Sequence, residues 1–435
     1  MSSFLVNEKI ILTNNSSNQD AFDRLRISEP NALFQYDLSL GKLPFLMNEF
    51  LSATGATITF DTAISTIDLK LTGSGITGKA IRQSFEYVPY QPGKSKLMMF
   101  SGVLEAEHGG MTGVLCRIGS FDSNIEKTGG IAGNGNGLFF ELGGENGKIL
   151  NVVKRLNDSD TKVAQTDWNY DKFDGTGPSG LTINDFSKAM IFAIDQEWLG
   201  SGRVRFGFVI NGSFKLCHSF NHFGADSITV PYTKTGKLPI RYEISSIQSQ
   251  IATLRMLSST VLSEGGYEPT GMSFSIGRTA GKTLTYATGV NPIPIISIRL
   301  NQIEPYNRKT ISLRKLCVLV NSSIAIQWDL YILPSTSNLV GSSFVDVNTT
   351  NSLAEYDISA TGITGSGGIL VAAGYGDSSI INDFQYDKYL ASPLVNSSIT
   401  GTSKVLCLSA IKLPGQTPTN TNPVVNGSLS WIEIL

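Results

Sequence analysis

The chain has 435 residues, enough for two or three domains with their own cores, and a formal net charge of −2. This near balance excludes the broad basic field of a nucleic-acid-binding protein, and only 16% of the residues are charged, against roughly 25% in ordinary soluble domains. Glycine is abundant, at 44 residues, and with frequent Ser, Thr and Asn it predicts many short strands joined by tight turns.

Residues 1–50 predict an extended N-terminal arm. The stretch "NNSSNQDAFDRLRISEP" is polar, and "NALFQYDLSLGKLPFLMNEF" carries aromatic residues without a sustained helical period. Because such segments commonly become ordered on a neighbour, we expect Phe22, Leu25, Arg26 and Phe34 to contact another subunit or a neighbouring protein.

No segment predicts a leader or a membrane span. The first residues have neither a basic start nor a small-residue cleavage site, and no apolar stretch reaches the ~18 residues of a transmembrane helix. We therefore expect a soluble protein, made in a cytoplasm, that does not act on a membrane.

From residue 51 onward, the apolar residues alternate in short runs separated by turn residues, which predicts strands. The clearest run is "GRVRFGFVING", in which Val204, Phe206, Phe208 and Ile210 share one face and Asn-Gly predicts a hairpin turn. The preceding "AMIFAIDQEWLG" predicts its antiparallel partner. Strands never alternate with helices of 10–15 residues, which disfavours a parallel α/β sheet.

The pattern restarts with "GMSFSIG" after a glycine-rich linker, "SEGGYEPTG". The sequence therefore predicts an all-β protein of two mainly antiparallel β-sandwich domains, of jelly-roll or lectin-like kind, at residues 51–265 and 266–435.

Two stretches resemble the Walker A pattern G-x-x-x-x-G-K-[ST]. "GRTAGKT" at 277–283 is one residue too short between its glycines, and "GKS" at 93–95 lacks the first glycine. A phosphate cradle also needs a strand before it and a helix after it. Both stretches lie between strand-like runs, which predicts turns, a hairpin turn in the case of "RTAG", and no nucleotide site.

Two pairs of carboxylates alternate along predicted strands, Glu105 with Glu107 and Asp195 with Glu197. Retaining glycosidases hold two carboxyl groups about 5–5.5 Å apart. Any two same-face residues at i and i+2 meet that spacing, so the pattern is unspecific. We expect no catalytic residues and no enzyme activity.

The sequence predicts no metal site and no cofactor. His218 and His222 are four residues apart in an extended run, where they would be about 13 Å apart, and a structural or interface role is favoured. The cysteines form no C-x-x-C pair, which excludes a zinc ribbon and predicts buried free thiols at Cys116, Cys217, Cys317 and Cys407.

The stretch "WNYDKFDGTGPSGLTIND" (168–185) places aromatic residues among turn formers. Its acidic and amide side chains lack the spacing of an EF-hand calcium loop. Trp168, Tyr170, Phe173 and Trp198 could form a saccharide-stacking platform or an interface anchor. The alternative is an ordered loop packed on its own sandwich.

Several segments resemble, in order, a family of virion structural proteins of tailed phages, many of them marine, and of some large DNA viruses. They are "DAFDRLRISEP" (20–30), "PYQPGKS" (89–95), "RIGSFD" (117–122), "WNYDKFDGTGPSG" (168–180), "DQEWLGSGRVRFGF" (195–208), "LPIRYEI" (238–244) and "SEGGYE" (263–268). The resemblance covers roughly residues 20–300. It implies a structural component of a virus particle, located in the virion, with no catalytic residues.

Within the particle we expect an outward-facing tail, baseplate or fibre component that self-assembles, as a trimer, and docks on neighbouring virion proteins. In that assembly the apolar faces of strands such as "PIISIRL" and "IAIQWDLYIL" would be buried between protomers. The alternatives are a head decoration protein, or a carbohydrate- or receptor-binding module that contacts host glycans through an exposed Trp/Tyr cluster.

Overall fold

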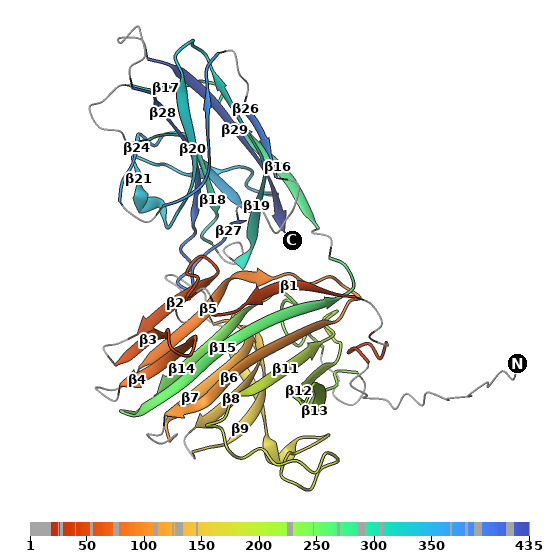
Figure 1. Ribbon diagram of the computed structural model, residues 1–435. Coiled ribbons are helices and arrows are strands. Elements are labelled where there is room, and N and C mark those ends of the chain that lie inside the picture. Colours follow the sequence, from red (N-terminus) through yellow and green to blue (C-terminus); the bar gives the residue numbers. More distant parts are fainter. Residues whose placement is uncertain are drawn as a thin grey trace, which may run out of the picture. The chain divides into compact units, whose positions relative to one another are not determined.

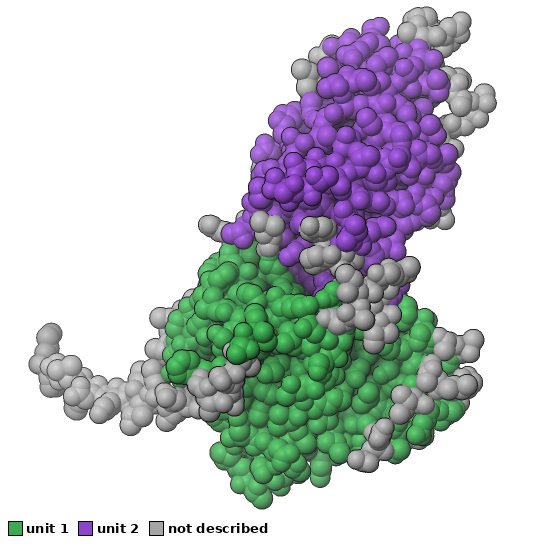
Figure 2. Space-filling view, turned by 180° about the vertical axis from the view of Figure 1, so that it is seen from behind, with its two compact units in different colours: residues 1–84, 88–124, 132–267 green, residues 85–87, 125–131, 268–435 purple. Residues whose placement is uncertain are grey.

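The chain folds into two compact units, drawn in different colours in Figure 2. Unit 1 comprises residues 1–84, 88–124 and 132–267, and unit 2 comprises residues 85–87, 125–131 and 268–435. The computed structural model describes residues 19–434 except 25, 27–28, 40, 53–54, 73–77, 108–111, 124–125, 127–133, 145–146, 224–228, 247, 268–269, 286–291, 304–307, 366–367, 379–381, 387–393 and 415–421.

Unit 1 is a sandwich of two antiparallel sheets. The eight-stranded sheet has the order β13-β12-β11-β6-β15-β4-β3, and β1 also pairs with β15. Its strands are β1 (Pro30–Tyr36), β3 (Ala56–Asp61), β4 (Thr66–Thr72), β6 (Lys96–Glu107), β11 (Met190–Gln196), β12 (Val204–Ile210), β13 (Ser213–Phe220) and β15 (Ile251–Glu264). The seven-stranded sheet has the order β10-β9-β8-β7-β14-β5-β2. Its strands are β2 (Met47–Ser52), β5 (Lys79–Val88), β7 (Val114–Phe121), β8 (Gly137–Gly144), β9 (Leu150–Leu156), β10 (Ser159–Ala164) and β14 (Leu238–Ser246).

The strand β12 shows how the alternating pattern builds unit 1. Val204, Phe206 and Phe208 are buried in the main hydrophobic core, as the alternation predicted. Antiparallel pairing with β11 confirms the predicted partner. Asn211 and Gly212 connect β12 to β13 with φ angles of 52° and 78°, and positive φ at both positions is what a two-residue hairpin turn requires.

The N-terminal part of the chain does not form the expected extended arm over residues 30–50. Residues 30–50 contribute β1, which pairs with the second half of β15, and part of β2, which pairs with β5. Phe34 is 6% exposed and lies in the core of unit 1. The apolar residues of this segment therefore bury against the chain's own sheets and are not left for a neighbour.

The segment before β1 is held against unit 1 by ion pairs. Arg26 contacts Asp195 of β11 at 2.5 Å and also pairs with Glu264. Phe22 is partly buried beneath the Arg24 guanidinium, 4.7 Å from its ring centre. Leu25, the fourth residue of the expected interface, lies outside the described residues. The described partners of Arg26 thus lie in its own unit.

Unit 2 is also built of antiparallel sheets. One sheet has the order β16-β29-β19-β26, with β17 paired to β29 and β27 to β19; a second has the order β22-β23-β18-β28-β20-β25; and β21 pairs with β24. The strands are β16 (Gly271–Gly277), β17 (Lys282–Thr283), β18 (Ile293–Leu300), β19 (Thr310–Val320), β20 (Ile326–Leu333), β21 (Leu339–Val340), β22 (Val345–Asp346), β23 (Ala354–Asp357), β24 (Gly362–Ile363), β25 (Ile369–Gly376), β26 (Asn382–Gln385), β27 (Leu394–Val395), β28 (Val405–Lys412) and β29 (Val424–Ile434).

The strands β18 and β20 correct the expectation that their apolar faces meet another protomer. Both are inner strands of their sheet, flanked on both sides. Their apolar residues, among them Ile296, Ile298 and Leu330, are fully buried in the core of unit 2. These faces are used within the unit and cannot also form an interface.

Both Walker-like stretches are turns between strands, as predicted. Gly93 has φ 83°, in the turn between β5 and β6. "GRTAGKT" joins β16 to β17, which both pair with β29 and not with each other, so the expected hairpin is wrong. Lys282 donates from Nζ to the Ala360 carbonyl at 2.9 Å. No described helix follows either turn to complete a phosphate cradle.

Helical structure in the described part of the chain consists of short 3₁₀ turns, including η1 (Gln165–Asp167) and η4 (Thr336–Asn338). No helix among the described residues is long and apolar enough to cross a membrane. The predicted all-β fold of antiparallel sandwiches is confirmed (Figure 1).

Candidate functional site

The aromatic residues expected to form a platform pack inside unit 1. Trp168 is 3% exposed, donates from Nε1 to the Val163 carbonyl at 3.2 Å, and packs against Phe208. Phe173 is fully buried and meets the same Phe208 ring edge-on, with 5.4 Å between ring centres. These two side chains extend the core and cannot stack on a ligand.

The other two aromatic residues are only partly accessible. Trp198 meets the Tyr90 ring edge-on at 5.7 Å and donates from Nε1 to the Thr233 carbonyl at 3.2 Å. Tyr170 is partly buried, and its backbone N–H donates to the Cys217 carbonyl at 3.1 Å. Trp168 and Phe173 therefore do not form an exposed platform, and their loop packs on its own sandwich.

Asp171 explains why that loop is ordered. Its carboxylate accepts backbone N–H bonds from Phe173 and Ser179, both at 2.8 Å. Asp174 accepts in the same way from the backbone N–H and hydroxyl of Thr176. These carboxylates therefore stabilise the backbone of the loop. Among the described residues, no group of three or more His, Cys, Asp or Glu could hold a metal ion.

The two histidines occupy separate structural positions. His218 is 6% exposed on β13, and burial lowers its pKa to about 4, so its ring is neutral at pH 7. His222 stacks on Tyr232 with 4.4 Å between ring centres, and its Nδ1 lies 2.6 Å from the Gly202 carbonyl. Three cysteines, Cys116, Cys217 and Cys407, are buried free thiols as predicted, whereas Cys317 is partly exposed.

Three of the four alternating carboxylates, Glu105, Glu107 and Asp195, form ion pairs. Glu105 binds Lys148, and Glu107 binds Lys70, each at 2.6 Å. Asp195 is fully buried between arginines of β12 and of the N-terminal segment. For Glu197, burial raises the pKa of the carboxyl. None of these four carboxylates lines the groove described below.

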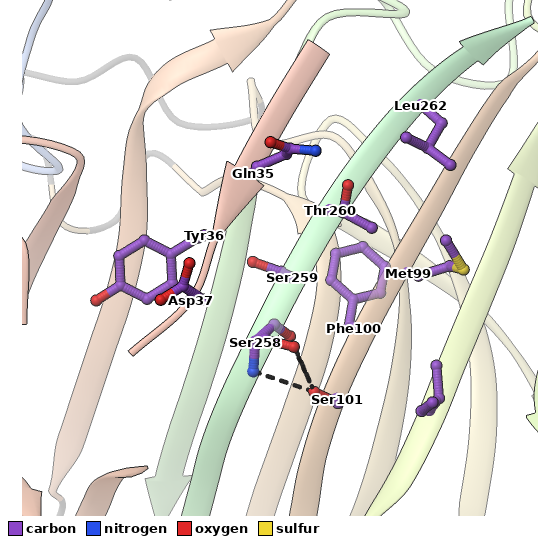
Figure 3. A pocket seen from close by; sticks show the side chains of 11 residues that line it. Gln35, Tyr36, Asp37, Met99, Phe100, Ser101, Ser258, Ser259, Thr260 and Leu262 are labelled. Atoms are coloured by element: carbon purple, nitrogen blue, oxygen red, sulfur yellow. Dashed lines mark hydrogen bonds between the residues drawn. The ribbon is translucent and has the colours of Figure 1, made fainter. Parts of the chain in front are cut away.

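The candidate site is a groove on the outer face of the eight-stranded sheet, with a volume of about 590 Å³ (Figure 3). This volume falls within the 300–1,000 Å³ typical of small-molecule sites. The groove crosses β1, β15, β6 and β11, which lie side by side in Figure 1. It is lined by Gln35, Tyr36, Asp37, Met99, Phe100, Ser101, Ile191, Ser258, Ser259, Thr260 and Leu262.

The groove forms where β15 changes partners. Residues 251–256 of β15 pair with β4, and residues 259–264 pair with β1, which leaves residues 257 and 258 between the two partners. At the same point the register with β6 shifts between Met256 and Ser258, which indicates a bulge. Bulges interrupt the regular pleat and redirect side chains, so a hollow at this point has a structural cause.

Hydrogen bonds stabilise the floor at the bulge. The Ser258 N–H donates to the Ser101 hydroxyl at 3.0 Å, and the two hydroxyls lie 2.9 Å apart (Figure 3). Tyr242, a buried residue of β14 in the opposite sheet, donates its hydroxyl to the Ser258 carbonyl at 2.9 Å. The backbone N–H and carbonyl of Ser258 therefore both have partners, which holds this part of the groove floor in place.

The lining is polar along one side and apolar along the other. In one cross-strand row, Gln35 faces Thr260, which faces Met99. In the next row, Ser258 faces Ser101, which faces Ile191. Figure 3 shows the β1 residues on one side of β15 and the β6 residues on the other. Most hydroxyl and amide groups therefore lie along β1 and β15, and most aliphatic side chains lie along β6 and β11. The exceptions are the Ser101 hydroxyl on β6 and the Leu262 side chain on β15.

The sequence analysis missed this groove. Its residues come from four strands and from Asp37, which follows β1; Gln35 and Leu262 are 227 positions apart (262 − 35), and no local motif joins the set. The available signal was the "SST" at 258–260. In a strand, three consecutive hydroxyl residues place hydroxyl groups on both faces, including the face that is otherwise expected to be apolar.

No protein-family model matches the sequence, and no curated protein does. Among solved structures, the carbohydrate recognition domain of Emp47p is 13% identical, covering 55% of this chain and 98% of that chain, with a TM-score of 0.35. Peanut lectin with a 9-mer peptide is 12% identical, covering 54% and 98%, with a TM-score of 0.32. A legume lectin-like domain from Entamoeba histolytica is 11% identical, covering 49% and 89%, with a TM-score of 0.29. These overlaps are too loose to transfer a ligand or a function to this chain.

Proposed function

We propose that unit 1 binds a saccharide in the groove and performs no chemistry on it. The observation that carries the proposal is the division of the lining into a hydroxyl-, amide- and carboxylate-bearing side and an aliphatic side. A pyranose ring has the matching surfaces, because its hydroxyls project around the rim while its C–H groups form an apolar face. An open, shallow groove also suits a ligand attached to a larger glycan.

In the proposed complex, the C–H face of the sugar lies on Met99, Leu262 and Ile191, the last of which is 41% exposed. The ring hydroxyls then meet Gln35 and Thr260 on the other side. The expected affinity is modest, because the aliphatic side chains provide less contact area than a Trp or Tyr platform would.

The test uses full-length protein on a glycan array, followed by titration of the best-bound oligosaccharide. Thr260→Tyr fills the middle of the groove, and we expect it to weaken binding at least tenfold. The matched control is Thr57→Tyr on β3, an exposed threonine in the same sheet, which should bind as the wild type does. Equal affinity for both variants, or no saccharide bound at millimolar concentration, would refute the proposal.

A second candidate function is a structural role in a virus particle, as an outward-facing tail, baseplate or fibre component. It rests on the family resemblance and is favoured by the edge strand β25. This strand, "ILVAAGYG", has no charged residue, and Ile369, Leu370 and Tyr375 are 48%, 50% and 64% exposed. Among the described strands only β20 pairs with it. Uncharged apolar edges are templates for pairing with another chain, so we propose that a second copy covers β25.

Sedimentation analysis tests this second candidate. We expect the wild type to have a mass that is a multiple of 46.9 kDa, and Ile369→Lys to reduce it to one chain, because a charge on the edge opposes strand pairing. Val345→Lys on the edge strand β22, where Val345 is 49% exposed, is the control and should leave the mass unchanged. A wild type that stays monomeric at high concentration contradicts self-assembly through β25. The wild-type mass also tests the trimer expected from the sequence.

A further inference from the structure

Among the described residues, Asp37 is the one charged side chain that lines the groove. It directly follows β1 and is exposed. The Ser39 hydroxyl and the Ser39 backbone N–H, the latter at 2.9 Å, both donate to its Oδ1. These bonds favour the ionised carboxylate and hold the pKa of Asp37 below its usual range. The polar side of the groove therefore carries a negative charge at neutral pH.

The nearby cations are paired elsewhere. Lys42 donates from Nζ to Glu49 at 3.1 Å and to the Ile58 carbonyl at 2.8 Å. Arg82 is fully buried, and it pairs with Glu49 and donates to the Tyr36 hydroxyl at 2.6 Å. Neither side chain lines the groove. No Lys or Arg is among the described residues that line the groove.

We propose that the groove selects neutral saccharides and rejects those that carry a carboxylate or sulfate next to the bound ring. This inference rests on the proposed function and adds the class of saccharide. An anionic substituent beside the hydroxyls that face β1 would lie within a few ångströms of the Asp37 carboxylate. At that separation, near the surface, like-charge repulsion weakens binding by roughly five- to tenfold.

Repulsion of this kind depends on salt. The Debye length falls from about 30 Å at 0.01 M ionic strength to about 3 Å at 1 M. The preference for neutral saccharides should therefore be largest at low salt and decline as salt is added. A steric rejection of the acidic group would not change with ionic strength, so the salt series separates the two causes.

The experiment measures paired affinities of the full chain for a neutral oligosaccharide and for the same oligosaccharide capped with sialic acid, at 0.01 M and 0.5 M NaCl. We expect the wild type to prefer the neutral partner at low salt. Asp37→Asn keeps the side-chain oxygen that accepts from Ser39 but removes the charge, and it should reduce the ratio of the two affinities toward one. Asp37→Lys should reverse the preference.

Asp174→Asn is the matched control. Asp174 is an exposed aspartate in the loop at 171–180 that accepts from the hydroxyl and the backbone N–H of Thr176, as Asp37 does from Ser39. Its substitution should leave the wild-type ratio intact. A protein that binds neutral and sialylated glycans equally, with a ratio insensitive to Asp37→Asn, overturns this inference and leaves saccharide binding standing. A protein that binds neither member of any pair overturns the proposed function itself.

Discussion

Phe34→Ala is expected to destabilise unit 1 by about 3–5 kcal/mol, the usual cost of removing a buried phenylalanine from a core. Phe34 lies in β1 with 6% of its surface exposed, between Leu33 and Tyr36 side chains that belong to the same core. The truncation leaves a cavity and also loosens the pairing of β1 with β15. For the same reason, deletion of residues 1–40 should unfold unit 1 rather than remove a dispensable arm.

The effect is measured by urea denaturation of the full chain, with hydrogen exchange of peptides from each unit to show which one opens. Phe223→Ala is the control, because Phe223 is 96% exposed and its truncation should change stability by less than about 0.5 kcal/mol. If Phe34→Ala matched that control, β1 would not be part of the folded core, and the original expectation of a detachable arm would be restored.

Glu243→Gln is the second substitution for which a large effect is expected, a loss of about 3–5 kcal/mol from unit 1. Glu243 of β14 is 1% exposed and accepts from Arg241 and from Arg117 of β7, the latter at 2.7 Å. Arg117 also binds Glu141 of β8 at 2.8 Å. Loss of the Glu243 charge removes the carboxylate that Arg241 and Arg117 both contact, and weaker charge compensation of a buried guanidinium such as that of Arg241 is costly.

The acid dependence of stability provides a second readout. Burial by itself would raise the pKa of Glu243, but the charges of Arg241 and Arg117 outweigh it and hold the pKa below its usual range. A group with a lowered pKa in the folded state adds stability above its unfolded pKa, near 4.3, and this stability is lost as the pH falls. The free energy of unfolding of the wild type should thus fall as the pH drops below about 4. Over the same pH range, the free energy of unfolding of Glu243→Gln should fall less, because the variant lacks this carboxylate.

Glu107→Gln is the control for this substitution. The Glu107–Lys70 pair lies on the same unit, with side chains 44% and 36% exposed, and such surface pairs contribute about 0–1 kcal/mol. A Glu243→Gln variant as stable as Glu107→Gln would mean that the network of arginines and glutamates does not stabilise unit 1.

The sequence by itself determined the class of fold, because strand alternation and turn chemistry are local. The period of two along β12 required one buried face, and Asn211-Gly212 could adopt the positive φ angles of a tight hairpin. The same local reasoning identified turns in place of phosphate cradles at Gly93 and at "GRTAGKT", since no helical pattern follows either stretch.

Only the tertiary structure decided which surfaces each strand uses, because strand pairing joins residues far apart in the sequence. Pro30 pairs with Glu264, so the aromatic residues of a segment without a clear period, such as Phe34, enter the core of unit 1. Trp168 and Phe173 are likewise buried by Phe208 of another strand, although their own loop is rich in turn residues. The groove forms where β15 stops pairing with β4 and begins to pair with β1, next to a bulge. The alternation of residues along β15 does not indicate where this change of partner occurs.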